Sequence, residues 1–491
     1  MNFSQQKLKL LFSLESFNKN VHYLLYLYCF IAAISIALTQ IILAVAILYW
    51  YIVLYIYRGN TGLNCNTDQV KTYFIFPLAL WLLANLISSL FGVAITRSLK
   101  EVISSAIYLC LPIMMYWLAK NSPASASEFF NRIKQYLFAF IVGQSFVGIH
   151  SLYSGPEEVK SLIGFPGPVT ESGQLVLIIT VLFALLLEGK DSFDKSLSEH
   201  CRLTTYLPLF AVYFILFLLM AWPDVILPVG SDYYLPVRLL SSIIVILATP
   251  TLINYSFIFP RLSGFYRSQS ADYGRIIVAF ALLLVVFIVN LKRGPWLGVI
   301  VALSMLSLIS GKKLCLISII LFSLFCSFLT PVHNRLSALS EHFTIAGGRK
   351  QMWEMGYDLI QLYPFGVGPD NARYMRQIDP SLPDLHRHMH NNLLNIAVET
   401  GWLGSISYIW WLLAIGFLSY LTWKNFKSSP SPLAKQGMML TAAIFFALVG
   451  WQVAGLVEYN FGDGEIRTMA FFFMGLLLVL NTLPKKLEQN S

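Results

Sequence analysis

The residue types best suited to acid–base chemistry gather in residues 331–401, called the long loop below. The long loop holds six Lys and Arg residues, seven Asp and Glu residues and five of the eight histidines: His333, His342, His386, His388 and His390. An imidazole titrates near pH ~6.5 and can take up a proton at neutral pH. An arginine stays charged and binds phosphate oxygens in pairs. These residues favour proton transfer and anion binding over the alternative, a solvated loop without chemistry.

A metal site is the other chemistry that the histidines suggest, because imidazole is a common zinc ligand. His386, His388 and His390 alternate along the chain. That spacing suits a strand, whereas the flanking residues indicate helix, and no Cys or paired acidic residue follows nearby. The sequence therefore predicts no metal ligand set.

The elements that position these residues are transmembrane helices. Of the 491 residues 57% are hydrophobic and 12% are charged, and the mean hydropathy is +0.65. Soluble domains carry about 25% charged residues, so a soluble enzyme, a nucleic-acid binder and a disordered scaffold are excluded. We predict an all-α polytopic transmembrane bundle of 12–14 spans in the lipid bilayer. The predicted apolar runs are 21–40, 41–57, 73–94, 102–118, 136–153, 173–188, 206–222, 238–259, 276–291, 295–310, 314–330, 402–422, 438–456 and 468–483.

The basic residues predict the orientation. With the N-terminus in the cytoplasm, 21 of the 34 Lys and Arg residues fall on inner segments, and six of the other 13 lie in the long loop. This is the positive-inside bias, so both termini are predicted to be cytoplasmic and the long loop to lie outside. The predicted organisation is 1–330 with about eleven spans, 331–401 as an outer catalytic loop, and 402–491 with three spans and a cytoplasmic tail.

The long loop itself is predicted to form a small helical cap on the membrane surface. Residues 349–362 have an apolar stripe at helical spacing, and Pro364 ends that helix. A second short helix is predicted over 371–378. A third is predicted from about Leu385 through His390 to Gly401, with His390 on one of its faces.

Four motifs in this order resemble the O-antigen ligase and O-antigen polymerase family. HNNLLNIAVETGWLG (390–404) is similar to the family's His-Asn, nine residues, Gly-x-x-Gly signature, with Gly401 and Gly404 in register. GGRKQMWEMGYDLIQLYPFGVGPDNARYM (347–375) and LKRGPWLGVIVALS (291–304) are similar to two further family segments, and IGFPGPVTESGQLVL (163–177) is a looser match. The resemblance covers roughly 160–480.

The sequence departs from the family pattern in two ways. Family members commonly have twelve spans, and the extra pair predicted here lies between 206 and 259. Before the Gly-Phe loop the family often has an arginine, where this chain has Lys160. Lysine keeps the charge but loses the bidentate geometry.

The resemblance implies a GT-C-like membrane glycosyltransferase of the bacterial inner membrane, with the long loop in the periplasm. It would move a glycan from undecaprenyl pyrophosphate to a sugar hydroxyl of lipid A–core, with inversion and without metal or cofactor. Arg293 and Arg349 would hold the pyrophosphate, and His390 would be the general base. Further substrate-binding or orienting residues would be Lys160, Lys292, His388, Asn391, Glu399 and Glu458, with Asp463 and Glu465 as other acids that could orient the base. From the residues alone, Asn391 favours a cap or brace of the helix over chemistry, and Glu399 could instead pair with Arg376 or Arg387. Gly366, Gly368, Gly401 and Gly404 are interpreted as turn and close-packing positions.

Two alternatives to the ligase remain. An O-antigen polymerase would use the same donor with a second lipid-linked repeat unit as acceptor, and would need the same residues. A transporter of lipid-linked sugars would instead predict charges in the middle of spans and repeat symmetry, whereas the charges here crowd one loop.

Overall fold

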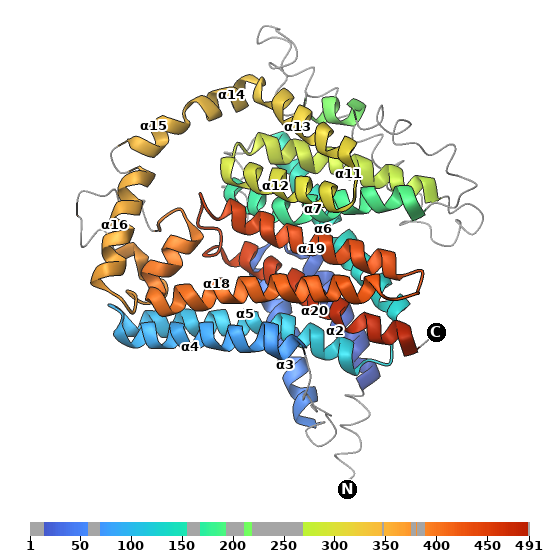
Figure 1. The fold of residues 1–491 in the computed structure, drawn as a ribbon, viewed down its shortest axis with the longest axis horizontal. Helices are drawn as coiled ribbons and strands as arrows, with labels where there is room; N and C mark the ends of the chain where they lie inside the picture. Colours follow the sequence, from blue (N-terminus) through green and yellow to red (C-terminus); the bar gives the residue numbers. More distant parts are fainter. Residues whose placement is uncertain are drawn as a thin grey trace.

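The protein is described by a computed structural model over residues 14–56, 69–154, 167–192, 211–218, 269–345, 348–374, 380 and 388–489. All regular elements among these residues are helices (Figure 1). Seven described helices are long and apolar enough to cross a membrane. The prediction of an all-α polytopic membrane protein is therefore confirmed. The predicted span 238–259 lies outside the described residues, and of 206–222 only 211–218 are described.

The N-terminal helices form one side of the bundle. They are α2 (Leu14–Ile31), α3 (Ile36–Ile56), a π-helical turn η1 (Lys71–Ile75), α4 (Phe76–Phe91), α5 (Ile95–Asn121) and α6 (Ala126–Ser154). Gly92 ends α4. A side chain there would strike the backbone of Val367 and Gly368 in the long loop. The glycine therefore lets the end of α4 approach the long loop closely.

Four helices of the middle region surround the site described below. They are α7 (Pro168–Ser192), α11 (Gln269–Val289), α12 (Arg293–Ile309) and α13 (Lys313–Ser327). A sharp turn at residues 290–292 joins α11 to α12, and Leu291 has φ +52 there. This left-handed conformation is uncommon for a leucine, so packing around the turn must hold it.

The last three helices are α18 (Asn392–Lys427), α19 (Ala434–Ala454) and α20 (Gly464–Gln489). Of these, α20 is the central one, with 89% of its apolar window buried, and it packs on α5 and α19. Trp411 on α18 and Trp451 on α19 are fully buried large side chains of the same core. Their burial supplies the apolar contacts that hold these helices together.

Helices α12 and α19 pack closely against each other. This packing brings together two of the segments that carry the site residues described below. A side chain at Gly298 would strike the backbone of Gly450, and one at Gly294 would meet Val457 and the β-carbon of Glu458. Small residues let transmembrane helices pack this closely. The start of α12 therefore lies against the segment that follows α19.

The long loop arches over one end of the bundle (Figure 1). The chain bends by 87° after α13 and continues as α14 (Thr330–Ser337) and α15 (Leu339–Thr344). It then forms α16 (Arg349–Leu362), whose bounds match the predicted helix 349–362. We call the end of the bundle that carries these helices the loop face.

One prediction inside the long loop is wrong, and a second is described only in part. The helix expected from about Leu385 begins only at Asn392, because Asn391 caps it, and His390 precedes it with φ +48. Of the second short helix, predicted over 371–378, only residues 371–374 are described, and Ala372–Tyr374 form a 3-10 turn, η4. The third helix also continues past Gly401 into the next span, with a kink at that glycine.

Candidate active site

The segment that carries His390 is fixed from several sides. Asn391 accepts a hydrogen bond from the N–H of Leu394 at 2.9 Å, which caps α18. The indole N–H of Trp353 on α16 donates to the carbonyl of Met389 at 2.9 Å. Met389 in turn donates its N–H to Asn395 at 3.1 Å. These bonds hold the backbone around His390 in its non-helical path.

The loop between α19 and α20 (455–463) is bound to this segment. Asn391 donates to the carbonyl of Leu456 at 2.9 Å, and the N–H of Asn392 donates to the carbonyl of Gly455 at 2.6 Å. The side chain of Asn392 also donates to Asn460 at 2.7 Å. The sequence interpretation of Asn391 as a residue that caps or braces the helix is confirmed.

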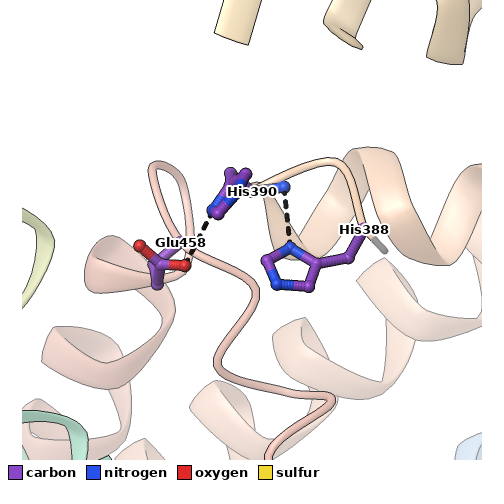
Figure 2. A group of neighbouring side chains, drawn as sticks. All are labelled: His388, His390 and Glu458. Atoms are coloured by element: carbon purple, nitrogen blue, oxygen red, sulfur yellow. Dashed lines mark hydrogen bonds and ion pairs between the residues drawn. The ribbon is translucent and has the colours of Figure 1, made fainter. Parts of the chain in front are cut away.

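These backbone ties bring His390 to Glu458. His390 Nδ1 lies 2.8 Å from a carboxylate oxygen of Glu458 (Figure 2). His388 lies on the other side, with the rings of the two histidines 4.2 Å apart, and its Nδ1 accepts the backbone N–H of His390 at 3.3 Å. Glu458 is thus the acidic residue that lies beside His390. Asp463 and Glu465, the other acids considered in the α19–α20 region, lie at the start of α20.

The charges around Glu458 keep it ionised. Burial opposes ionisation, but the hydrogen bond with His390 and the electrostatic influence of His390, His388 and Arg349 outweigh it. The pKa of Glu458 therefore lies below its ordinary value. A carboxylate beside Nδ1 orients the imidazole of His390, and an imidazole oriented in this way can act as a proton acceptor.

One arginine contacts this pair, and two further arginines form a group with it. Arg349, the first residue of α16, lies 3.5 Å from the second oxygen of Glu458. Arg293, the first residue of α12, donates to the backbone carbonyl of Arg335 at 3.3 Å, and Arg335 donates to the carbonyl of Leu291 at 3.3 Å. Arg335 and Arg349 both act electrostatically on Arg293. Like charges held together bind an anion, because the anion relieves their repulsion.

Arg335 is a member of this group that the sequence analysis did not single out. It lies on α14, in a stretch whose only signal in the sequence is a positive charge on the predicted outer side of the membrane. Lys292 occupies the position before the first residue of α12, next to Arg293. Lys160 lies outside the described residues, so its predicted role stays a prediction.

An apolar cavity of about 750 Å³ begins at the arginines. Arg293, Arg349 and Trp353 line one end of it, and Lys312, in the turn after α12, lines the other. The cavity therefore runs the length of α12, a 17-residue helix, or about 25 Å. The remaining lining is mostly apolar and comes from α7, α11, α12, α13 and the α14–α15 arch.

A buried carboxylate supports the turn that presents Arg293. Glu171 on α7 is 2% exposed and accepts hydrogen bonds from Asn290 at 3.0 Å and from Ser151 at 3.3 Å. Asn290 opens the turn that ends at Arg293. One residue before Glu171, Thr170 donates to Asp463 at 2.5 Å, beside the α19–α20 loop. The first turn of α7 thus connects the arginine segment with the segment of Glu458.

Glu399 has a supporting position. Its backbone carbonyl accepts hydrogen bonds from Ser88 and Gly368, and its carboxylate accepts one from Tyr459 at 3.4 Å. The partners expected from the sequence, Arg376 and Arg387, lie outside the described residues. We interpret Glu399 as a residue that joins α4, the long loop and the α19–α20 loop.

The glycines of the motifs serve turns, as predicted. Gly366, Gly368 and Gly401 have φ of +86, +97 and +66, a region that glycine enters without a steric penalty. A side chain at Gly401 would strike the backbone of Pro364 and Phe365. The motif glycines therefore let the turn after α16 cross directly over the kink in α18.

A second ionic network lies on the loop face. Asp370 accepts from Arg97 at 2.8 Å and from Arg373 at 2.6 Å, and Arg467 pairs with Glu101 at 3.0 Å. These pairs join the start of α5 to the long loop and to α20. Their charges are satisfied within the protein, which favours a structural role.

Fold and site together define a multi-pass helical membrane protein with a cationic, histidine-containing site at one end of an apolar cavity. Residues 278–409 match the family model described as O-antigen ligase. That range contains Arg293, Arg335, Arg349, His388 and His390. The match agrees with the family resemblance predicted from the motifs, over residues 278–409. Comparison with curated proteins finds no match.

Proposed function

We propose that this protein transfers a glycan from a polyprenyl pyrophosphate carrier, undecaprenyl pyrophosphate, to a sugar hydroxyl of lipid A–core. The observation that carries the proposal is the apolar cavity that ends at Arg293 and Arg349, beside the pair His390 and Glu458. A lipid tail, an anionic headgroup and a proton acceptor are the three features that this donor and this reaction require.

The donor would bind with its tail in the cavity and its pyrophosphate on the arginines. A cavity of about 750 Å³ lies within the usual range for ligand pockets, about 300–1,000 Å³. Arg293, Arg335 and Arg349 bring three positive charges against the single negative charge of Glu458. This excess favours the pyrophosphate, and it stabilises the additional charge that develops as pyrophosphate leaves.

The acceptor hydroxyl would be activated by His390. The imidazole takes the hydroxyl proton while the acceptor oxygen forms a bond to the anomeric carbon of the donor sugar. The bond from that carbon to the pyrophosphate oxygen breaks, and its electron pair leaves with the pyrophosphate. Glu458 orients His390 and stabilises the imidazolium that forms. A single displacement of this kind inverts the anomeric configuration.

The location of the buried charges supports transfer over transport. Glu171 and Arg467 are the fourth residues of α7 and α20, and Glu399 lies just before the kink in α18. A transport pathway would call for ionisable groups midway along the spans. Among the described residues these three buried charged side chains instead lie at helix ends on the loop face, where a headgroup would bind.

The proposal includes the membrane orientation. The protein would lie in the bacterial inner membrane, with residues 1–330 and 402–491 supplying the spans, both termini cytoplasmic and residues 331–401 periplasmic. The positive-inside bias of the sequence supports this, since Lys312, Lys424, Lys427 and Lys486 follow or end helices on the side opposite the loop face.

The proposal is tested with purified protein in lipid nanodiscs and a polyprenyl pyrophosphate-linked glycan as donor. Lipid A–core and a second lipid-linked glycan are offered as acceptors in parallel. Product on lipid A–core supports the ligase, and product only on the lipid-linked glycan replaces it with the polymerase. His390→Ala should abolish transfer, whereas His333→Ala, a change at an exposed histidine on α14, should not. Full turnover in His390→Ala would refute the site assignment.

A further inference from the structure

Three residues at the site also form a set of metal ligands. His388, His390 and Glu458 each offer one ligand atom, and these atoms lie within 4.8 Å of one another. We propose that they bind a Zn²⁺ ion, and that the bound ion inhibits glycan transfer by occupying the base. The inhibition rests on the proposed function, whereas the binding does not.

The structure removes both reasons that the sequence gave against a metal. The first reason was a helix through the histidines, which would separate two side chains at i and i+2. Residues 388–391 are not helical, His390 has φ +48, and the two imidazole rings are 4.2 Å apart. The second reason was the lack of an acidic ligand nearby. Glu458 supplies it from 68 residues further along the chain.

The geometry is close to that of a zinc site. Bonds of about 2.0–2.2 Å in a tetrahedral arrangement separate the ligand atoms by about 3.4 Å. His390 Nδ1 and the Glu458 oxygen are 2.8 Å apart, and all three ligand atoms lie within 4.8 Å. Small side-chain rotations therefore suffice to admit the ion. Two histidines, one glutamate and an open fourth position form a ligand set that zinc accepts.

The surrounding charge argues for an inhibitory ion over a resident one. Arg349 lies 3.5 Å from the second oxygen of Glu458, so it repels a dication at the first oxygen. A resident metal centre is normally surrounded by groups that offset its charge. Here the repulsion from Arg349 lowers the affinity for the ion, so that a chelator can remove it. The side chains of His390 and Glu458 are 29% and 22% exposed, so the ion can reach them from solvent.

The binding test uses the full chain in nanodiscs and Zn²⁺ alone, measured by competition with a chromophoric chelator. His388→Ala and Glu458→Gln should each weaken binding by at least about tenfold, and His333→Ala should leave it unchanged. Arg349→Gln should tighten binding, because it removes a repelling charge and leaves all three ligands. Equal affinity across these variants, or weaker binding in Arg349→Gln, would overturn the site.

The inhibition test follows transfer in the same nanodiscs. Zn²⁺ should stop turnover of the wild-type protein at the concentration that fills the site, and a chelator should restore it. If Zn²⁺ binds as described but turnover continues when the site is full, the inhibitory role is wrong. If no acceptor is glycosylated even without zinc, the proposed function fails while the binding result stands.

Discussion

The pairing of Glu458 with His390 leads to a quantitative expectation for Glu458→Gln. The amide is nearly isosteric with the carboxylate, so the backbone bonds of the α19–α20 loop remain. What is lost is the negative charge at 2.8 Å from the imidazole and 3.5 Å from Arg349. The imidazolium that forms when His390 takes the acceptor proton then has no counter-charge.

The magnitude follows from the loss of one charge-assisted hydrogen bond in a partly buried site. Such a bond contributes about 1.5–3 kcal/mol, which corresponds to a decrease of about ten- to a hundredfold in rate. The loss should fall on kcat, because the charge on His390 exists only once the proton has moved. Donor KM should change less, since the three arginines remain.

The assay is single-turnover transfer at saturating donor, with acceptor concentration varied. Glu354→Gln is the matched control, because Glu354 also lies in the long loop and pairs with Lys350, but both side chains are more than 60% exposed. Exposed pairs of this kind contribute little, so the control should keep wild-type rates. A Glu458→Gln rate within twofold of wild type would show that the carboxylate does not assist His390.

Four further outcomes are expected. Arg335→Ala should raise donor KM by about tenfold, measured by steady-state kinetics, and an unchanged KM would remove Arg335 from the donor site. Gly401→Ala should lower the melting temperature, since a left-handed φ costs a residue with a side chain roughly 1–2 kcal/mol, and the new side chain would also strike the turn after α16. A melting temperature equal to that of wild type would contradict this account of the kink. Glu171→Leu should weaken donor binding more than Glu171→Gln, which keeps an acceptor for Asn290; equal donor affinities would mean that the turn before Arg293 is held otherwise. The pKa of Glu458 is lowered on folding, so its contribution to stability is complete above its ordinary pKa and is lost as the pH falls through the lower folded value. Wild type should therefore lose more thermal stability in acid than Glu458→Gln. Parallel pH profiles of the two proteins would refute the shift.

Much of the local structure follows from neighbouring residues and was predictable for that reason. The apolar stripe from Arg349 and the stop at Pro364 predict α16 correctly, because both signals lie within the helix or one turn of it. Asn391 was correctly interpreted as a cap. The glycines at 366, 368 and 401 were correctly interpreted as turn and close-packing positions, since few other residues tolerate them.

The start of α18 was mispredicted for a physical reason. The residues from Leu385 onward have helical periodicity, which predicts a helix that starts there. The helix instead starts after Asn391, because hydrogen bonds with Trp353, Leu456 and Gly455 hold residues 389–392 in another conformation. These partners lie tens of residues away along the chain. Tertiary hydrogen bonds therefore override the local preference, and they turn His390 away from the helix surface toward Glu458.

The sequence by itself determined the class of the protein, because lipid has no water to bond the backbone and long apolar runs can then only be helices. It also indicated the resemblance to the O-antigen ligase family and singled out three residues that the structure places at the candidate site: Arg293, Arg349 and His390. Only the tertiary structure decided that Arg335 joins them, that Glu458 is the partner of His390, and that an apolar cavity ends at the arginines. These relations depend on how closely α12 and α19 pack at Gly298 and Gly450, and such a contact between distant segments leaves no periodic signal along the chain.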